Sequence, residues 1–162
     1  MTYNDFVETF KNQVNALSHE KGLELAITIS KELFPEYQKF SETHNWGDPE
    51  LLLEAIKLCE ESRTRVLDKS DIDPLITSLE KVIPDTEDFR DYDGSYALNA
   101  GAAVLSALLY TIDKSPKYLF DIGTLYTDAI DFKLHETNVV QNEIDNHPLM
   151  QEARQRLMVL ST

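Results

Sequence analysis

The chain has 162 residues, a length that suits one ordinary domain whose core needs no disulfide or metal for stability. Hydrophobic residues make up 42% and charged residues 27%, which excludes the low-hydrophobicity composition of a disordered chain. Twenty-nine acidic against fifteen basic side chains give a net charge of −14, which argues against nucleic acid and anionic membranes as partners.

The cysteine count and the first residues predict the compartment. A single cysteine, Cys59, can form no intramolecular disulfide and excludes zinc sites built on two or four cysteines. Residues 1–11 lack the cationic start and the apolar run of a signal peptide. No stretch approaches the roughly eighteen consecutive apolar residues of a membrane-spanning helix. We therefore expect a cytoplasmic protein with no membrane partner.

The first half of the chain shows helical periodicity. Apolar residues recur at helical spacing over residues 4–17 and predict a first helix. Ser18 can cap a second helix, whose apolar residues form a broad buried face. Pro35 lacks a backbone N–H, so we expect this helix to stop or kink near Phe34 before it resumes toward Trp46.

Prolines preceded by aspartates predict the starts of the next two helices. Asp48 can cap a third helix with proline in its first position, and this helix is expected to run to about Val66. The same signal recurs at Pro74, preceded by Asp71 and Asp73, and predicts a short fourth helix.

Three further helices complete the predicted fold. The alanine-rich and leucine-rich run 97–112 predicts the most buried helix, because small residues permit close approach of a neighbour. Ser115 before proline opens a helix to about Glu136, and Pro148 opens the last helix. The sequence therefore predicts an all-α fold, a compact single-domain bundle of about seven helices over residues 1–162, one of them kinked near Pro35.

Residues 85–93 form the most distinctive predicted surface stretch, with five carboxylates and two aromatic rings. The carboxylates belong to Asp85, Glu87, Asp88, Asp91 and Asp93. Three interpretations are open: the carboxylates bind a basic protein surface, they chelate a hard cation, or they are simply solvated. Solvation is the commonest outcome for aspartate-rich loops.

A second constellation is Asp128, Asp131 and His135, spaced three and four residues apart so that all three can share one helical face. This arrangement offers two or three metal ligands. The simpler interpretation is an exposed face with a weak carboxylate–imidazole contact. No phosphate-binding glycine loop, dinucleotide fingerprint, zinc-protease motif or nucleophile elbow is present, so no cofactor is predicted and the question of an enzyme stays open.

Several spaced blocks carry a family resemblance. They read FPEYQKFS at 34–41, WGD at 46–48, IPDTEDF at 83–89, YALNA at 96–100, LSALL at 105–109 and HPLM at 147–150. In this order they resemble the bacterial family called domain of unknown function 416, the YjaG-like proteins. The resemblance implies an all-α domain over nearly the whole chain and supplies no catalytic residue.

The sequence does not by itself fix a function. The best prediction is a non-catalytic acidic protein-binding module, most concretely an immunity or inhibitor protein that covers a basic toxin such as a nuclease. The net charge and the small size favour it, because complementary charge speeds encounter with a basic partner. The alternative is an uncharacterised enzyme or a small-ligand or metal-binding helical protein.

Overall fold

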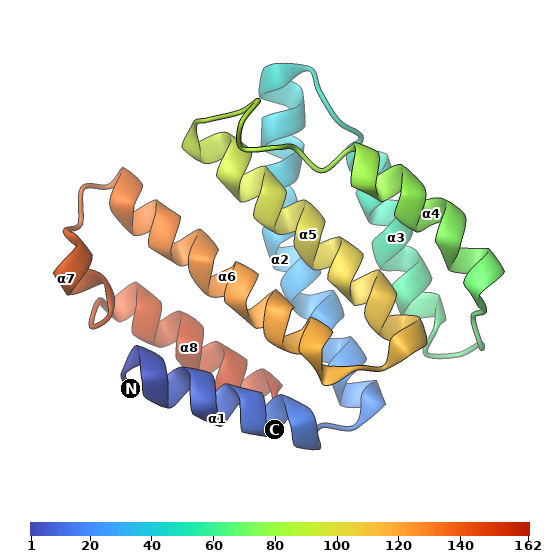
Figure 1. The fold of residues 1–162 in the computed structure, drawn as a ribbon, viewed down its shortest axis with the longest axis horizontal. Helices are drawn as coiled ribbons and strands as arrows, with labels where there is room; N and C mark the ends of the chain where they lie inside the picture. Colours follow the sequence, from blue (N-terminus) through green and yellow to red (C-terminus); the bar gives the residue numbers. More distant parts are fainter.

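The computed structural model describes residues 1–162 as an all-α fold without strands (Figure 1). Its helices are α1 (Tyr3–Ala16), α2 (His19–His44), α3 (Pro49–Glu61), α4 (Lys69–Lys81), α5 (Tyr92–Asp113), α6 (Pro116–Glu136), α7 (Gln141–Ile144) and α8 (Pro148–Leu160). The prediction of an all-α bundle is confirmed. The predicted set of about seven helices does not include the short α7.

Helix α5 is the centre of the bundle. It packs most extensively against α2 and α6 and also contacts α3 and α4. On the other side of α6, α1 and α8 lie side by side (Figure 1). Ala100, Gly101 and Ala103 are buried on α5, as the small-residue pattern predicts, and a Cβ on Gly101 would lie 2.9 Å from Ile83. The small residues therefore set how closely the neighbouring segments approach α5.

Two predicted helix boundaries, the end of α3 and the start of α4, are wrong. Helix α3 ends at Glu61 rather than near Val66, and α4 begins at Lys69 rather than at Pro74. Asp68 and Asp71 form a capping box in which each side chain accepts a hydrogen bond from the other's backbone N–H. This box starts α4 one and a half turns before Pro74, which the helix tolerates in its interior.

Two further boundaries differ from the prediction. Helix α5 begins at Tyr92, five residues before the predicted start, because Asp91 caps it. The sequence predicts that the helix either stops or kinks near Pro35. Helix α2 continues through Pro35, so the stop is excluded. Pro35 has no N–H to donate to the Lys31 carbonyl, and one intrahelical hydrogen bond is therefore missing where the kink is predicted.

The sequence predicts no stretch apolar enough to cross a membrane. By its length and mean hydropathy, however, α5 meets the criteria for a membrane-spanning helix. In the bundle, 61% of its most apolar eighteen-residue stretch is buried. A buried core helix meets the same criteria, so this property is weak evidence for a membrane.

Tyr37 joins three parts of the fold. Its side chain is fully buried on α2, and its hydroxyl donates to the Val82 carbonyl at 2.5 Å and accepts from the Asp48 N–H at 3.2 Å. Gly47 has a φ of +87°, and a Cβ there would lie 2.4 Å from the Tyr37 hydroxyl oxygen. This hydroxyl therefore fixes the start of α3 and the end of α4 relative to α2.

Replacing Tyr37 with phenylalanine should lower the free energy of unfolding by about 1–3 kcal/mol, because two backbone groups lose a shared partner. Tyr92, which is 39% exposed and makes no hydrogen bond through its hydroxyl, is the matched control: Tyr92→Phe should change stability by less than about 0.5 kcal/mol. Urea denaturation of both variants measures the difference. Equal effects would show that the Tyr37 hydroxyl does not tie these segments together.

Candidate functional site

The acidic segment, residues 85–93, leads from α4 into α5 (Figure 1). One aromatic side chain anchors it. Phe89 packs between Phe40, His44 and Trp46, with ring centroids 4.9, 5.4 and 5.3 Å away. All three contacts are edge-on, a geometry that aromatic pairs prefer. The middle of the segment is therefore fixed against the end of α2.

Four of the five carboxylates of the acidic segment divide into two kinds. Asp91 accepts a hydrogen bond from the Gly94 N–H at 2.9 Å and caps α5, while Asp85 accepts one from the Glu87 N–H at 2.9 Å. Glu87 and Asp88 are exposed and their side chains make no hydrogen bond or ion pair within the chain. Two of the predicted partner-binding carboxylates thus shape the segment, and others are free to meet a partner.

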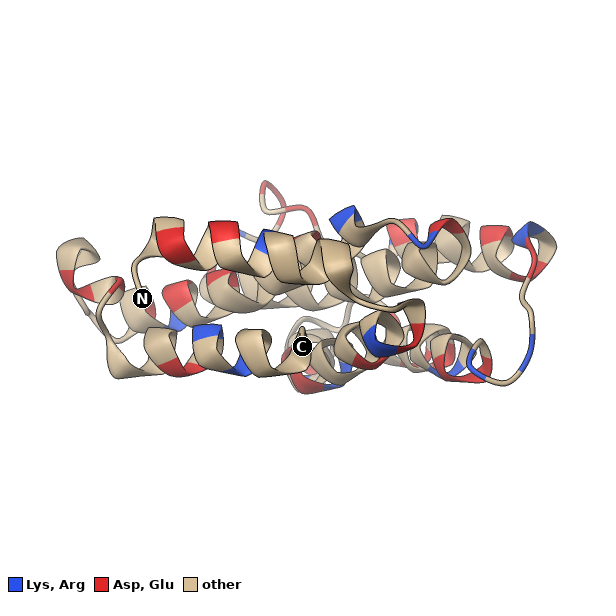
Figure 2. Ribbon diagram, turned by 90° about the horizontal axis from the view of Figure 1, so that it is seen from below, with Lys and Arg blue, Asp and Glu red and all other residues tan.

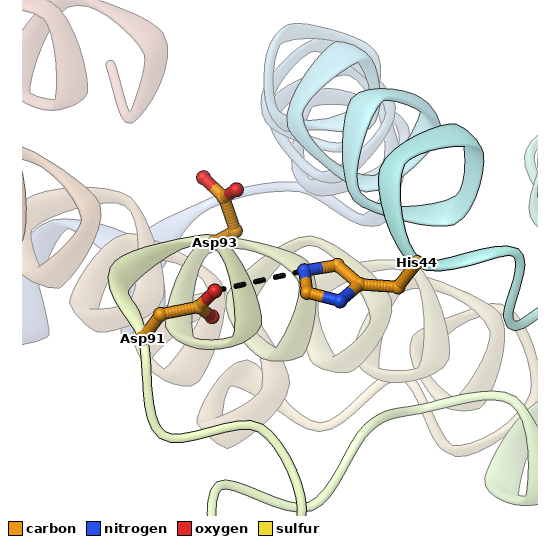
Figure 3. Close-up of side chains that lie close together, drawn as sticks. All are labelled: His44, Asp91 and Asp93. Carbon is orange, nitrogen blue, oxygen red and sulfur yellow. Dashed lines mark ion pairs between the residues drawn. The ribbon is translucent and has the colours of Figure 1, made fainter.

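The fold adds His44 to the acidic segment (Figure 3). Its Nε2 atom lies 3.6 Å from the second carboxylate oxygen of Asp91, the one that does not cap α5. One ligand atom from each of His44, Asp91 and Asp93 lies within 4.8 Å of the others. Sequence reasoning missed His44, because it lies 47 residues before Asp91 and has no local metal-binding pattern around it.

These three side chains could hold a divalent cation after a small adjustment. Zinc–nitrogen and zinc–oxygen bonds of about 2.0–2.2 Å place two ligands no more than roughly 4.3 Å apart. The His44–Asp91 distance already satisfies this limit. The Asp93 ligand atom lies within 4.8 Å of the other two and would have to move closer to share an ion with them.

Of the three residues predicted to share a face of α6, the structure brings Asp131 and His135 into contact. His135 lies 3.4 Å from an Asp131 carboxylate oxygen through Nδ1, and the same nitrogen is 2.9 Å from the Asp131 carbonyl oxygen. Its Nε2 lies 2.8 Å from the side-chain oxygen of Gln141. These hydrogen bonds raise the pKa of His135, the Asp131 carbonyl contributing most. A metal ion at His135 would have to displace one of these partners.

Asp128 faces a different environment from His135. With Asp131, it lines a cavity of about 280 Å³ that also contains Asp145 and Arg154. Burial, and secondly the nearby Asp131 carboxylate, raise the pKa of Asp128. A carboxyl with a raised pKa in a cavity is suited to proton transfer, so this cavity is where the enzyme alternative would place its chemistry.

Arg154 is the buried cation of that cavity. Only 5% of its side chain is exposed, and it pairs with an Asp145 carboxylate oxygen at 2.7 Å and donates to the Met1 carbonyl at 3.1 Å. Neither Asp145 nor Arg154 was predicted, because they lie on different elements from Asp128 and no spacing pattern connects them.

A family model described as a protein of unknown function, DUF416, matches residues 9–160. The chain belongs to the DUF416 family. The blocks at 34–41, 83–89 and 147–150 that suggested this resemblance all fall within the matched range. The family assignment predicted from the sequence is therefore confirmed.

The fold of this DUF416 chain is similar to that of a solved relative. A crystal structure of a DUF416 family protein from Shewanella baltica OS155 superposes with a TM-score of 0.81 at 24% sequence identity, and the match covers 94% of this chain and 82% of that chain. At this identity the likeness concerns the fold alone. No curated protein matches the chain.

The raised pKa of Asp128 predicts a stabilising substitution. The folded state holds the Asp128 proton more tightly than the unfolded state does, so stability falls as the pH rises from the unfolded pKa through the folded one. Asp128→Asn removes a charge that is unfavourable at neutral pH and should raise the melting temperature there. The gain should shrink as the pH is lowered toward about 4, where aspartate begins to protonate in both states.

Thermal denaturation at several pH values measures this effect, and Asp121→Asn is the control because Asp121 is exposed on the same helix. A loss of stability at neutral pH in Asp128→Asn would show that the charged carboxylate is a required partner in the cavity.

Proposed function

We propose that this chain is a non-catalytic acidic protein-binding module that recognises a basic protein, most concretely as an immunity or inhibitor protein for a basic toxin such as a nuclease. The observation that carries the proposal is the acidic segment, whose exposed carboxylates are held on a fixed frame by Phe89 and by the Asp91 cap. A fixed binding segment loses less conformational entropy on association than a flexible one.

The electrostatics of the whole chain favour the same type of partner. Asp and Glu are spread over both layers of helices (Figure 2), and the net charge is −14. Such a field attracts a basic protein from solution and raises its association rate, by 10-fold to 1000-fold in strongly steered pairs. Charge complementarity at the docking segment then sets the orientation of the partner.

The acidic segment also lies beside features that suit the centre of an interface. Tyr92, directly after the Asp91 cap, is 39% exposed and stacks on Tyr96 with ring centroids 6.4 Å apart. Tyr96 and Asp93 line a neighbouring cavity of about 350 Å³ that also contains the half-exposed Leu149. An exposed tyrosine next to a pocket is a typical anchor of protein interfaces.

The test replaces only carboxylates whose loss leaves the Asp91 cap of α5 intact. The triple variant Asp85→Asn, Glu87→Gln, Asp88→Asn keeps the Asp85 hydrogen-bond acceptor and removes three charges. Its matched control is Glu8→Gln, Glu24→Gln, Asp121→Asn, which removes three charges at exposed positions on α1, α2 and α6. Both variants have the same net charge, so any difference between them reports the position of the charges.

Affinity capture from a lysate with wild-type bait identifies a basic partner, and stopped-flow mixing then measures its association rate at several salt concentrations. We expect the segment variant to associate at least about threefold more slowly than the control variant at 0.01 M salt, with the gap closing as the Debye length shortens from about 30 to about 10 Å at 0.1 M. Melting temperatures should stay close to wild type. Equal association rates for both variants, or capture of no basic protein, contradicts the proposal.

A second candidate function is the binding of a divalent metal ion by His44, Asp91 and Asp93, which the proximity of their ligand atoms favours. An imidazole with two carboxylates suits zinc and similar first-row ions. The capping role of Asp91 uses one carboxylate oxygen and leaves the other directed at His44 (Figure 3). A metal ion here would connect the end of α2 to the start of α5.

Zinc titration followed by thermal denaturation tests this second function. A site that binds only the folded state should raise the melting temperature of the wild-type protein by mass action. His44→Gln should abolish the rise, whereas His135→Gln, in the constellation predicted from the sequence, should preserve it. The reverse pattern would move the metal site to α6, and no rise in the wild-type protein would contradict both sites.

A further inference from the structure

A basic pocket lies at the opposite end of α5 from the acidic segment. The pocket has a volume of about 520 Å³ and lies between residues 62–69, which join α3 to α4, and the end of α5. Arg63, Arg65, Lys69 and Lys114 line it, together with a single carboxylate, Asp68. Four of the fifteen lysines and arginines of a chain with net charge −14 therefore converge on one pocket.

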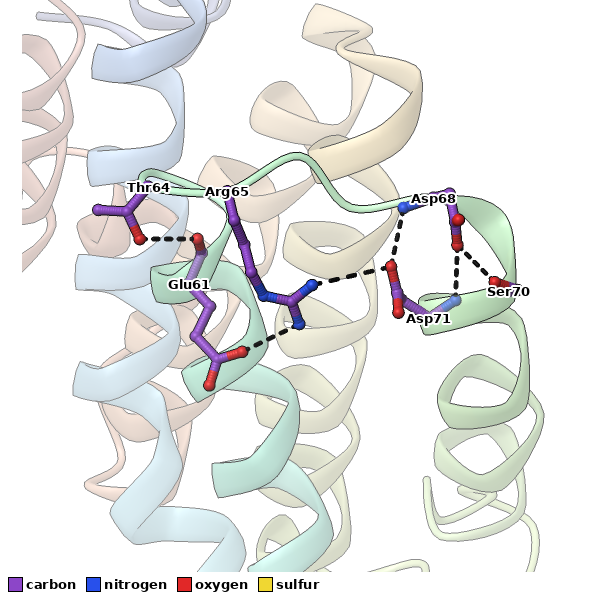
Figure 4. Close-up of polar contacts among 6 residues, drawn as sticks. All are labelled: Glu61, Thr64, Arg65, Asp68, Ser70 and Asp71. Carbon is purple, nitrogen blue, oxygen red and sulfur yellow. Dashed lines mark hydrogen bonds and ion pairs between the residues drawn. The ribbon is translucent and has the colours of Figure 1, made fainter.

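Local hydrogen bonds and ion pairs occupy the carboxylates near this pocket (Figure 4). Asp68 accepts hydrogen bonds from the Asp71 N–H at 3.1 Å and from the Ser70 hydroxyl at 2.5 Å, and these bonds lower the pKa of Asp68. Arg65 extends between Glu61, at 3.2 Å, and Asp71, at 3.9 Å. The capping box and Arg65 thus use both aspartates and hold the connecting segment in place.

The remaining cations of the pocket have no partner within the chain. Arg63, Lys69 and Lys114 are exposed and form no ion pair with any carboxylate, although acidic residues outnumber basic ones almost twofold. With Arg65 paired, Asp68 offsets one of these three charges, and the remaining positive charges repel one another unless a further negative charge lies between them. A bound oxyanion removes that repulsion and accepts their hydrogen bonds.

His19 also lines the same pocket. Its ring packs at a tilt against that of Tyr110 with centroids 4.9 Å apart, and its Nδ1 atom is buried without a hydrogen-bond partner. Burial, and secondly the charge of Lys114, lower the pKa of His19 and so favour its neutral form. A neutral imidazole can donate one hydrogen bond to an anion.

We infer that this pocket binds a small anionic ligand that carries a phosphate or several carboxylate groups, with Arg63, Lys69 and Lys114 as its charged contacts. The ligand is a small molecule and not a nucleic acid, because the acidic surface elsewhere on the chain repels a long phosphate backbone. The inference does not depend on the proposed protein-binding function, since the two sites lie at opposite ends of α5 (Figure 1).

The competing explanation is that these cations only offset helix dipoles. Helix α3 ends at Glu61 and α5 ends at Asp113, and positive side chains are favourable next to the C-terminal ends of helices. This explanation predicts no stabilisation by anions beyond that of ordinary salt. Anion titration therefore separates it from a binding site.

The test titrates the protein with inorganic phosphate, pyrophosphate and citrate at constant ionic strength maintained with sodium chloride. At a tenfold excess of ligand over its Kd, the melting temperature of the wild-type protein should rise by about 3–6 °C. A stronger response to pyrophosphate identifies a phosphate ligand and a stronger response to citrate identifies a polycarboxylate, and either response supports the inference. The His19 ring protons should shift during the same titration by NMR.

The double variant Arg63→Gln, Lys69→Gln should weaken anion binding at least about tenfold, as loss of two charge-assisted contacts predicts. Its matched control, Lys11→Gln, Lys81→Gln, removes two exposed lysines that form no ion pair and lie outside the pocket, and it should bind as the wild-type protein does. The inference is overturned if none of the three anions exceeds sodium chloride in effect, or if the two double variants lose binding equally. In either case the cations act only on the helix ends.

Discussion

The close packing of α5 against α2 and α6 is the constraint on which the positions of both candidate sites depend. Small buried residues on α5, such as Ala100 and Ala103, let its neighbours approach closely. The acidic segment leads into the first turn of α5, and the basic pocket includes its last turn. Any change that shifts α5 along its axis therefore moves both sites together.

The acidic segment shows how apolar packing can prepare a polar surface. Phe89 gains stability by burial among the rings at the end of α2, and Asp91 gains it by capping α5. These two interactions limit the conformations of the residues between and before them. The exposed carboxylates Glu87 and Asp88 are consequently presented on a defined backbone, although they contribute no contact to the fold themselves.

Local patterns in the sequence were sufficient to predict the fold class, and non-local contacts explain what the sequence did not reveal. Periodic apolar residues and capping residues identify the long helices, because both act within one or two turns. The error at Pro74 arose where a proline signal was preferred to the Asp68–Asp71 capping box. The position of His44 beside Asp91 depends on the packing of α2 against α5, which no local spacing encodes.

The charge distribution separates two electrostatic environments within one small protein. Helix α5 has 22 residues, so its ends lie roughly 30 Å apart at about 1.5 Å per residue. This separation is several times the Debye length of about 8 Å at physiological salt. Charges at the acidic segment are therefore largely screened from the basic pocket, and an anion bound at the pocket does not alter the attraction between the acidic segment and a basic partner by direct electrostatics. Coupling between the two sites would require a displacement of α5 itself, and the buried contacts of α5 on several sides oppose such a displacement.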